Sequence, residues 1–310
     1  MAALIDILLA TYEGEKYLRE QVESIINQDF CDWRLLVRDD GSVDETCSIL
    51  SEFAERYPGK VVIINDELGR LGPAKSFEQL AFHSTAPYIA FSDQDDVWQH
   101  NKLQLELSAI RQVEKSSNEP DAVLVHSDLQ VMNEDMSVLA NSFWSYQNYN
   151  PQKMYKLNCL LTQNYVTGCT MLINRQLLDI ALPFPAAVIM HDWWLALVAC
   201  INGQIVEVNS KTVLYRQHDR NENGAQKSGL SYIARKLKQG IDEQQQSLIR
   251  TCYQARALLN MNELPAKDAF LIGHYVSMYE LNWFHRRLVM IRMRFLKYGI
   301  VRKIAMFFLL

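Results

Sequence analysis

Short apolar runs alternate with helix-like segments through the first 92 residues, and this alternation constrains the fold more than any other feature. Strands are predicted over 4–9, 33–38, 61–64 and 88–91. Apolar residues at helical spacing fill the intervals, which predicts helices over 16–27, 44–57 and 73–83. Such alternation is typical of a parallel sheet with helices on both faces. We therefore predict an α/β fold with a Rossmann-like, mostly parallel sheet.

Polar loops follow three of these strands, around Thr11, Asp40 and Asp93. In open α/β sheets, ligands bind beyond the carboxyl ends of the strands. We therefore expect the three loops to meet in one crevice.

The remainder of the chain continues less regularly and then becomes helical. A helix after residue 102 is followed by predicted strands over 122–128, 166–173, 205–208 and 212–215, with further helices from Arg175 and near His191. Residues 135–164 show no clear period. Beyond residue 229 the pattern is helical, which predicts a catalytic domain over 1–228 and a helical region over 229–310.

The net charge of −5 is divided unevenly along the chain. Residues 229–310 hold thirteen Lys/Arg and five Asp/Glu, a balance of +8, so residues 1–228 carry −13. An acidic body suits metal binding, and a basic C-terminal region suits an anionic surface. The acidic body argues against nucleic acid as a general partner.

Six cysteines are scattered without a C-x-x-C pair, which favours neither a zinc site nor a disulfide framework. The N-terminus shows no signal peptide, and no apolar run reaches the roughly 18–20 residues of a membrane span. These features predict reduced thiols in a cytoplasmic protein.

The segment Asp93-Gln94-Asp95-Asp96 places three carboxylates directly after a buried strand. Carboxylates this close repel one another unless a cation lies among them. Oxygen ligands of this kind suit Mg²⁺ or Mn²⁺. The alternative is a solvated acidic turn that caps the following helix.

A second acidic loop, Asp39-Asp40-Gly41-Ser42, also follows a strand. Ser42 or Asp44 can cap the next helix, but capping does not account for the pair Asp39-Asp40. A carboxylate here can accept a hydrogen bond from a pyrimidine imide or a ribose hydroxyl.

Taken together, several stretches resemble the family 2 glycosyltransferases, whose fold is GT-A. The stretches are Ala10–Leu18, Asp39–Ser42, Asp93–Asp96, Thr167-Gly168-Cys169, His191-Asp192-Trp193-Trp194 and Gln217–Asn221. They occur in the family's order over about the first 225 residues, and this order is more specific than any one motif.

The resemblance implies a set of donor-binding and metal-binding residues. The implied nucleotide-sugar site comprises Ala10, Thr11, Tyr12, Glu13, Asp40, Gly72, Lys75, Asp93, Gln94 and Asp95. Asp40 is implied to read the base, and a Mg²⁺ or Mn²⁺ ion is implied at Asp95, Asp96 and His218. The order of importance among the three aspartates stays open. For His218 the alternative is a hydrogen-bonded structural residue, with Arg216 or Arg220 nearby in either case.

The resemblance further implies that Asp192 is the catalytic base of an inverting transfer. One carboxylate must take the proton of the attacking hydroxyl, and the dipole of the apolar helix that Asp192 opens would help to hold it ionised. The alternative is that Asp192 is only the N-cap of that helix. Residues implied on the acceptor or sugar side are Trp98, Gly168, Cys169, His191 and Trp193.

Residues 283–310 contain seven Lys/Arg, no acidic residue and many apolar residues. This pattern predicts an amphipathic helix on an anionic membrane. The alternative is a basic helix packed on the catalytic body or on a second subunit.

Within the family, Gly72–Phe77, Ser92–Trp98 and Arg216-Gln217-His218 look most like the rhamnosyltransferase branch. This implies dTDP-L-rhamnose as donor, with UDP-sugars and other hexoses open. The implied reaction glycosylates a hydroxyl of a glycan or lipid-linked acceptor during O-antigen-like surface polysaccharide assembly, at the inner face of the plasma membrane. Two alternatives remain: a nucleotidyltransferase that makes a nucleotide sugar, and a non-catalytic carbohydrate-binding scaffold.

Overall fold

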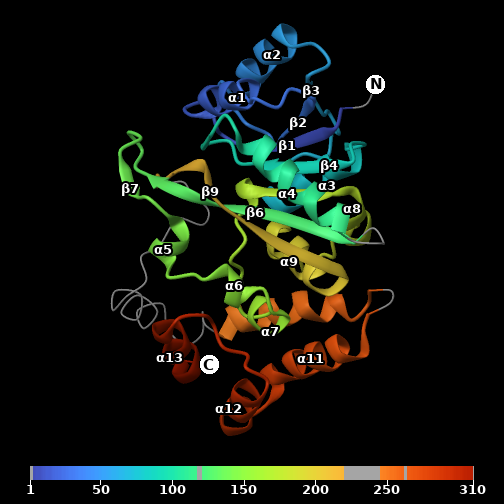
Figure 1. Cartoon of the computed structure of the whole chain (residues 1–310), viewed down its shortest axis with the longest axis vertical. Helices are drawn as coiled ribbons and strands as arrows, with labels where there is room; N and C mark the ends of the chain where they lie inside the picture. The colour runs from blue at the N-terminus through green and yellow to red at the C-terminus, as the bar shows by residue number, and fades with distance from the viewer. Residues whose placement is uncertain (1–2, 117–120, 220–244, 262–263, 310) are drawn as a thin grey trace.

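The computed structural model describes residues 3–116, 121–219, 245–261 and 264–309 (Figure 1). The predicted boundary between residues 228 and 229, as well as Arg220 and Asn221, lies outside the described residues. Within the described residues, nine strands form one sheet. They are β1 (Ile5–Thr11), β2 (Trp33–Asp39), β3 (Val61–Ile63), β4 (Tyr88–Ser92), β5 (Val97–Trp98), β6 (Ala122–Met132), β7 (Val138–Ala140), β8 (Met171–Asn174) and β9 (Gly203–Arg216).

The sheet is mixed but mostly parallel, in the order β3-β2-β1-β4-β8-β6-β9-β5, with β7 paired to β6. Strands β1 to β4 run parallel, and β6 runs parallel to β9. Strand β8 lies antiparallel between β4 and β6, and β5 lies antiparallel to β9. The predicted fold class is confirmed.

Two local predictions are corrected by the structure. The two strands expected over 205–208 and 212–215 are one continuous strand, β9. The strand expected over 166–173 begins only at Met171, because residues 168–170 form a 3-10 turn.

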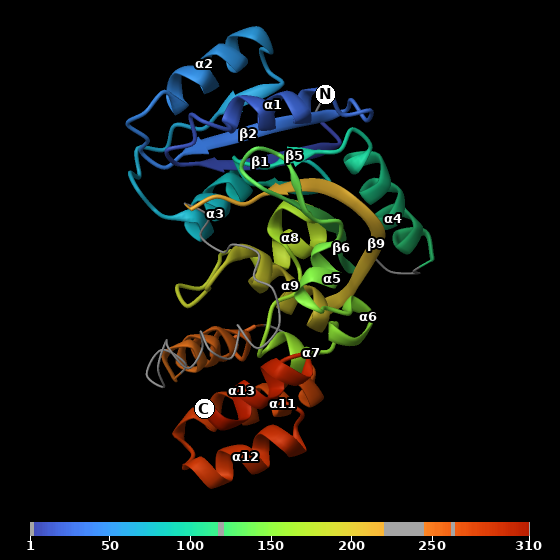
Figure 2. The same ribbon diagram turned by 90° about the vertical axis from the view of Figure 1, so that its left-hand side faces the viewer.

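Helices cover both faces of the sheet (Figure 2). They are α1 (Leu18–Ile26), α2 (Thr46–Arg56), α3 (Pro73–His83), α4 (Lys102–Ser116), α5 (Phe143–Gln147), α6 (Pro151–Met154), α7 (Leu157–Leu160), α8 (Arg175–Ala181) and α9 (His191–Asn202), then a helix over 245–258, α11 (Ala266–Ser277), α12 (Trp283–Arg292) and α13 (Ile300–Leu309). Helices α1, α2 and α4 share one hydrophobic cluster, while α3, α8 and α9 share the other.

Strand β1 shows how the sequence assigns side chains to these clusters. Successive residues of a strand point to opposite faces. Ile7 and Leu9 therefore pack with α1, whereas Leu8 packs with α3, and all three are fully buried. Because both faces are covered, the strand is a continuous apolar run rather than an alternating one.

The C-terminal helices extend the second of these clusters. Leu258, Tyr275 and Phe295 belong to the same buried cluster as Leu8 of the sheet. The helical extension is therefore confirmed and packs on the body. The single helix expected over 283–310 is instead two helices, α12 and α13, with positive φ angles at Arg294 (57°) and Gly299 (91°) between them.

Candidate active site

One cavity of about 1320 Å³ lies at the carboxyl ends of β1, β2 and β4, where the three polar loops meet. The loop residues form its N-terminal wall. A C-terminal wall opposite is formed by Leu248, Thr251, Tyr275, Arg302 and Met306. Pockets for one small ligand are typically about 300–1,000 Å³. This cavity exceeds that range.

The loop after β1 is tied to its neighbours through its backbone. The amides of Tyr12, Glu13, Gly14 and Glu15 donate respectively to Gln94 Oε1 (2.9 Å), Ser42 Oγ (2.8 Å), Thr46 Oγ1 (2.8 Å) and Asp44 Oδ2 (3.1 Å). Gln94 Nε2 also donates to the carbonyl oxygen of Tyr12 at 2.9 Å. Both ends of the Gln94 amide thus hold this loop.

The adjacent aspartates of the second loop have different partners. Asp39 accepts hydrogen bonds from the hydroxyl of Thr11 and from the amides of Gly41 and Ser42, so it closes the turn. Asp40 lines the cavity. It accepts from the amides of Leu71 (2.7 Å) and Gly72 (2.8 Å). Gly72 lies at φ 78°, a backbone conformation that favours glycine.

A buried arginine, Arg38, organises this wall. Its guanidinium is 1% exposed and donates to Asp40 Oδ1 (2.6 Å), Asp66 Oδ2 (2.7 Å) and the carbonyl oxygen of Gly69 (2.7 Å). Burial opposes ionisation of Asp40, but the amides of Leu71 and Gly72 together with Arg38 lower its pKa. The carboxylate of Asp40 therefore stays charged in the cavity wall.

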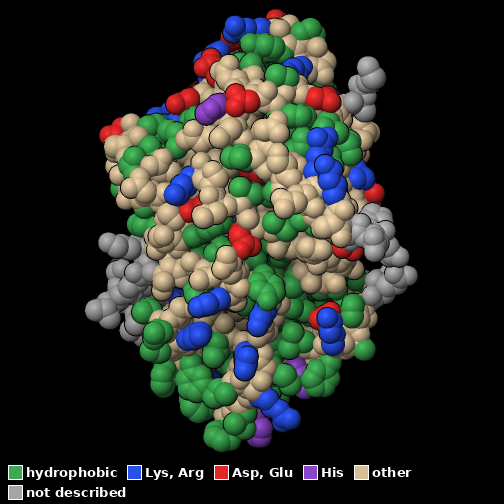
Figure 3. Space-filling view, viewed as in Figure 1, with side chains coloured by type: hydrophobic (Ala, Val, Ile, Leu, Met, Phe, Trp, Pro, Cys, Tyr) green, Lys and Arg blue, Asp and Glu red, His purple; other side chains and the backbone are tan. Residues whose placement is uncertain are grey.

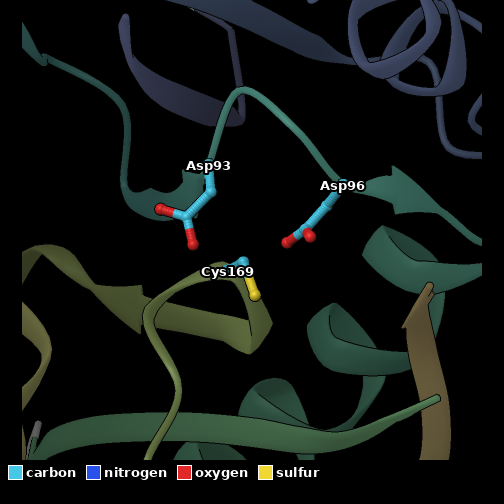
Figure 4. Close-up of side chains that lie close together, drawn as sticks. All are labelled: Asp93, Asp96 and Cys169. Atoms are coloured by element: carbon cyan, nitrogen blue, oxygen red, sulfur yellow. The ribbon is translucent and has the colours of Figure 1, made fainter. Parts of the chain in front are cut away.

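The three carboxylates after β4 lie in different environments. Asp93 and Asp95 line the cavity, whereas Asp96 is fully buried. One ligand atom each from Asp93, Asp96 and Cys169 lie within 4.8 Å of one another, and Figure 4 shows these side chains grouped below the loop. Burial, followed by the charges of Asp95 and Asp93, raises the pKa of Asp96 well above its usual value.

Asp95 is paired with His218, as Oδ2 lies 2.8 Å from Nε2 of the imidazole. The ring of Tyr17 stacks on His218 with a centroid separation of 4.9 Å. The guanidinium of Arg216 lies 4.7 Å from the same tyrosine ring, and its Nε donates to the carbonyl oxygen of Asp95. The hydroxyl of Tyr17 donates to Glu134. Tyr17 therefore contacts His218, Arg216 and Glu134 at once.

Asp192 lies in the first turn of α9 and faces the same cavity. The N-cap residue is Met190, so Asp192 is not the cap. Oδ1 accepts from the amide of Trp193 at 2.5 Å. Burial raises the pKa of Asp192 to about 7, although hydrogen bonds from Trp193, Gly168 and Asn164 act in the opposite direction. The expectation that the helix dipole holds Asp192 ionised is therefore corrected, because burial outweighs it. A carboxyl group with this pKa can exchange protons near neutral pH.

Most of the residues implied on the donor side lie together. The cavity is lined by Ala10, Thr11, Tyr12, Glu13, Asp40, Gly72, Asp93, Gln94 and Asp95. Lys75 lies outside this lining, because its ammonium group donates to Glu78 (2.5 Å) and to the carbonyl oxygen of Phe184 (2.9 Å).

The residues implied on the acceptor side are divided. Gly168, His191 and Trp193 line the cavity, whereas Trp98 and Cys169 are buried outside its lining. The His191 ring packs against Phe77 at 3.9 Å and Phe91 at 5.1 Å, and neither ring nitrogen has a hydrogen-bond partner among the described residues. Burial lowers the pKa of His191 to about 3, so it is neutral at physiological pH.

The site residues that the sequence did not single out include Arg38, Tyr17, Glu134 and Asn164, as well as the C-terminal wall. Arg38 directly follows the apolar run Leu35-Leu36-Val37 of β2, and a charge at the end of such a run can signal a buried partner. Glu134 lies 117 residues from Tyr17, and no local pattern connects the two.

Comparison with known proteins adds a family and a set of relatives. The family model described as Glycosyl transferase family 2 matches residues 6–180, more than half of the chain. The dTDP-rhamnosyl transferase RfbG of Shigella flexneri is 27% identical over 282 residues, covering 85% of this chain and 86% of that protein. The UDP-Glc:alpha-D-GlcNAc-diphosphoundecaprenol beta-1,3-glucosyltransferase WfgD of Escherichia coli is 26% identical over 208 residues, covering 66% and 73%.

Solved structures show the same fold. Residues 1–349 of S. aureus TarS in complex with UDP-GlcNAc superpose with a TM-score of 0.58 at 16% identity, covering 91% of this chain and 72% of that one. The mannosyltransferase PcManGT of Pyrobaculum calidifontis, in complex with GDP-Man and Mn²⁺, gives 0.57 at 17% identity, covering 95% and 74%. At these identities the likeness extends to the fold, which is of the predicted GT-A type.

Proposed function

The chain belongs to glycosyl transferase family 2, and from this premise we propose that it transfers a sugar from a nucleotide-sugar donor to an acceptor hydroxyl. We propose an inverting reaction that builds a bacterial surface polysaccharide. The observation that carries the proposal is the meeting of Asp40, Asp95 and Asp192 in one cavity.

The proposed base is Asp192. The acceptor hydroxyl oxygen forms the new bond to the anomeric carbon while the bond to the diphosphate oxygen breaks on the opposite face. Asp192 takes the hydroxyl proton, and the nucleoside diphosphate leaves with the bonding electron pair. The raised pKa of Asp192 suits this step, because a stronger base accepts the proton more readily.

The residues for a divalent cation are Asp95 and His218, with Asp93 beside them. Asp93 and Asp95 offer hard oxygen ligands at the cavity surface, as Mg²⁺ and Mn²⁺ require. The buried group at Asp96 fits less well, since it includes the soft sulfur of Cys169, whereas Mg²⁺ and Mn²⁺ prefer oxygen ligands. A bound cation would stabilise the negative charge of the departing diphosphate. Tyr17 would then hold the imidazole of His218 in place.

For the donor we propose dTDP-L-rhamnose. The similarity to the dTDP-rhamnosyl transferase RfbG covers most of both proteins, and it supports this choice over UDP-sugars. Asp40 Oδ2 accepts one hydrogen bond, from Gly72, and a carboxylate oxygen can accept two. We assign the remaining capacity to the imide N–H of thymine.

The nucleotidyltransferase alternative is disfavoured by the loop after β1. A triphosphate cradle needs backbone amides that point at the ligand. The amides of residues 12–15 instead donate to side chains of neighbouring loops. A non-catalytic scaffold would have no need of a base such as Asp192 in the cavity.

The first test is calorimetric binding of dTDP, UDP and GDP, each with and without Mn²⁺. We expect dTDP to bind in the presence of Mn²⁺, and we expect Asp95→Ala to abolish that binding. The matched control is Asp179→Ala, which removes an exposed carboxylate of α8 outside the cavity. Absence of nucleotide binding under every condition would overturn the donor site and favour the scaffold.

For the acceptor we propose a glycan, or an oligosaccharide linked to lipid, presented at the inner face of the plasma membrane. WfgD, by its name, acts on a diphosphoundecaprenol-linked sugar, which supports an acceptor of this class. In the part of the chain that the structure describes, each helix is too short or too polar to cross a bilayer.

A further inference from the structure

Helices α12 and α13 expose apolar side chains in two stripes. The stripes are Phe284, Leu288 and Ile291 on α12, and Ile300, Ile304 and Phe308 on α13; we call these six residues the C-terminal apolar face. Their exposed fractions range from 49% to 76%. The spacings of three, four and seven or eight residues place each stripe on one side of its helix.

Basic side chains accompany this face. Residues 281–310 contain no Asp or Glu, and Arg292, Arg294 and Lys303 are exposed. Figure 3 shows hydrophobic and basic side chains gathered at the lower end of the molecule, where Figure 1 places α12. Arg287 and Arg302, in contrast, are 4% and 5% exposed and belong to the packed side of the helices. Structure, rather than sequence, separates these two groups of basic residues.

The positive charge of the C-terminal apolar face favours an anionic partner over a second copy of the chain. Two copies of the chain that met through this face would bring their basic residues together, with no acidic residue of 281–310 between them. An anionic lipid surface complements the same charge, and aromatic side chains favour the boundary between headgroups and acyl chains. Because the helices are too short to span a bilayer, they would lie along its surface.

We propose that the C-terminal apolar face binds the surface of an anionic bilayer. Helix α13 connects this face to the cavity, because Arg302, Ala305 and Met306 on its other side line the C-terminal wall. A bilayer bound here lies close to the C-terminal wall of the cavity, where we place the acceptor. This last consequence rests on the proposed function, since it needs an acceptor that is carried on lipid.

The test is co-sedimentation of the full chain with vesicles of phosphatidylcholine alone or with about 30% phosphatidylglycerol. We expect binding to the anionic vesicles, and a loss of at least about tenfold in Phe284→Ser/Ile291→Ser, because two exposed apolar side chains no longer enter the lipid. The matched control is Phe82→Ser, which removes a 52% exposed phenylalanine from α3. Charge reversal in Arg292→Glu/Lys303→Glu should remove the preference for phosphatidylglycerol.

Equal vesicle binding by wild type and Phe284→Ser/Ile291→Ser would overturn the proposal. So would a wild-type dimer in sedimentation equilibrium that the same double substitution dissociates, with no vesicle binding. Calorimetry with dTDP and Mn²⁺ is run on each variant. Wild-type protein that binds nucleotide but not anionic vesicles refutes this inference alone, whereas wild-type protein that does not bind nucleotide refutes the proposed function.

Discussion

The N-terminal wall of the cavity is held by hydrogen bonds, whereas the C-terminal wall is held mainly by apolar packing. In the first, Gln94, Arg38 and Asp40 tie three loops together. In the second, Leu248 and Met306 belong to the hydrophobic cluster, and the polar contacts include Thr251 with Tyr275 and Arg302 with Gln147. The geometry of the first wall therefore depends on many polar contacts, and that of the second on few.

This difference matches the roles that we propose for the two walls, with the donor at the first and the acceptor at the second. The family match, residues 6–180, contains the N-terminal wall and ends before the C-terminal helices. A nucleotide diphosphate presents the same polar groups in every donor of its class, and fixed partners suit it. Acceptors differ from enzyme to enzyme, and an apolar wall changes by substitution at lower cost.

The largest effect is expected at Asp192, the proposed base. Asp192→Asn removes the proposed base and keeps its shape, so transfer should fall by about 10²–10⁴-fold. Binding of dTDP with Mn²⁺ should remain, because the donor contacts lie on the N-terminal wall. Product formation by mass spectrometry and calorimetry measure the two quantities. Full transfer activity in this variant would remove Asp192 from the mechanism.

The comparison of walls is tested by two buried arginines. Arg38→Met leaves Asp40 and Asp66 without their cation, and we expect a loss of about 3 kcal/mol in the free energy of unfolding with weaker nucleotide binding. Arg302→Met leaves the neutral oxygens of Gln147, so about 1–3 kcal/mol is expected with nucleotide binding unchanged. Chemical denaturation measures the free energy of unfolding of each variant, and calorimetry measures its nucleotide binding. Equal effects of both variants on nucleotide binding would contradict the division.

A smaller effect is expected at Tyr17. Tyr17→Leu removes the ring that stacks on His218 and Arg216, and metal-dependent nucleotide binding should weaken about tenfold. Tyr17→Phe keeps the ring and loses only the hydroxyl contact with Glu134, so it should weaken binding less. Binding in the absence of Mn²⁺ should be equal in all three proteins. A larger loss in the phenylalanine variant would assign the role to the hydroxyl.

The sequence predicts much of the fold and of the site, but it does not distinguish the roles of some neighbouring residues. The sheet and the acidic loops follow from periodicity and from the position of polar residues after apolar runs. Asp95 and Asp96 look alike in the sequence, yet one lines the cavity and the other is buried. Residues Val97 and Trp98 pair with β9, more than 100 residues away, and this pairing fixes the chain beside Asp96. A contact so distant leaves no local signal.

The smallest expected effect is a pH dependence at Asp192. A rise in pH should lower the stability of the protein and raise its activity. The pKa of this carboxyl is raised from 3.8 to about 7 in the folded protein, so wild type loses stability as pH rises through that interval. The same rise ionises the base, and kcat/KM should increase with pH up to about 7. Neighbouring His191 does not titrate in this range, since its pKa is lowered to about 3.

Asp192→Asn should therefore be more stable than wild type at pH 8 by about 1–2 kcal/mol, after allowance for partial solvent contact, and similar in stability near pH 4. Acidic groups such as Glu106 are present in both proteins and cancel in the difference. Urea denaturation at the two pH values measures it. A stability difference independent of pH would mean that Asp192 ionises as freely as a surface carboxylate, and the rise of kcat/KM toward pH 7 would then need another group.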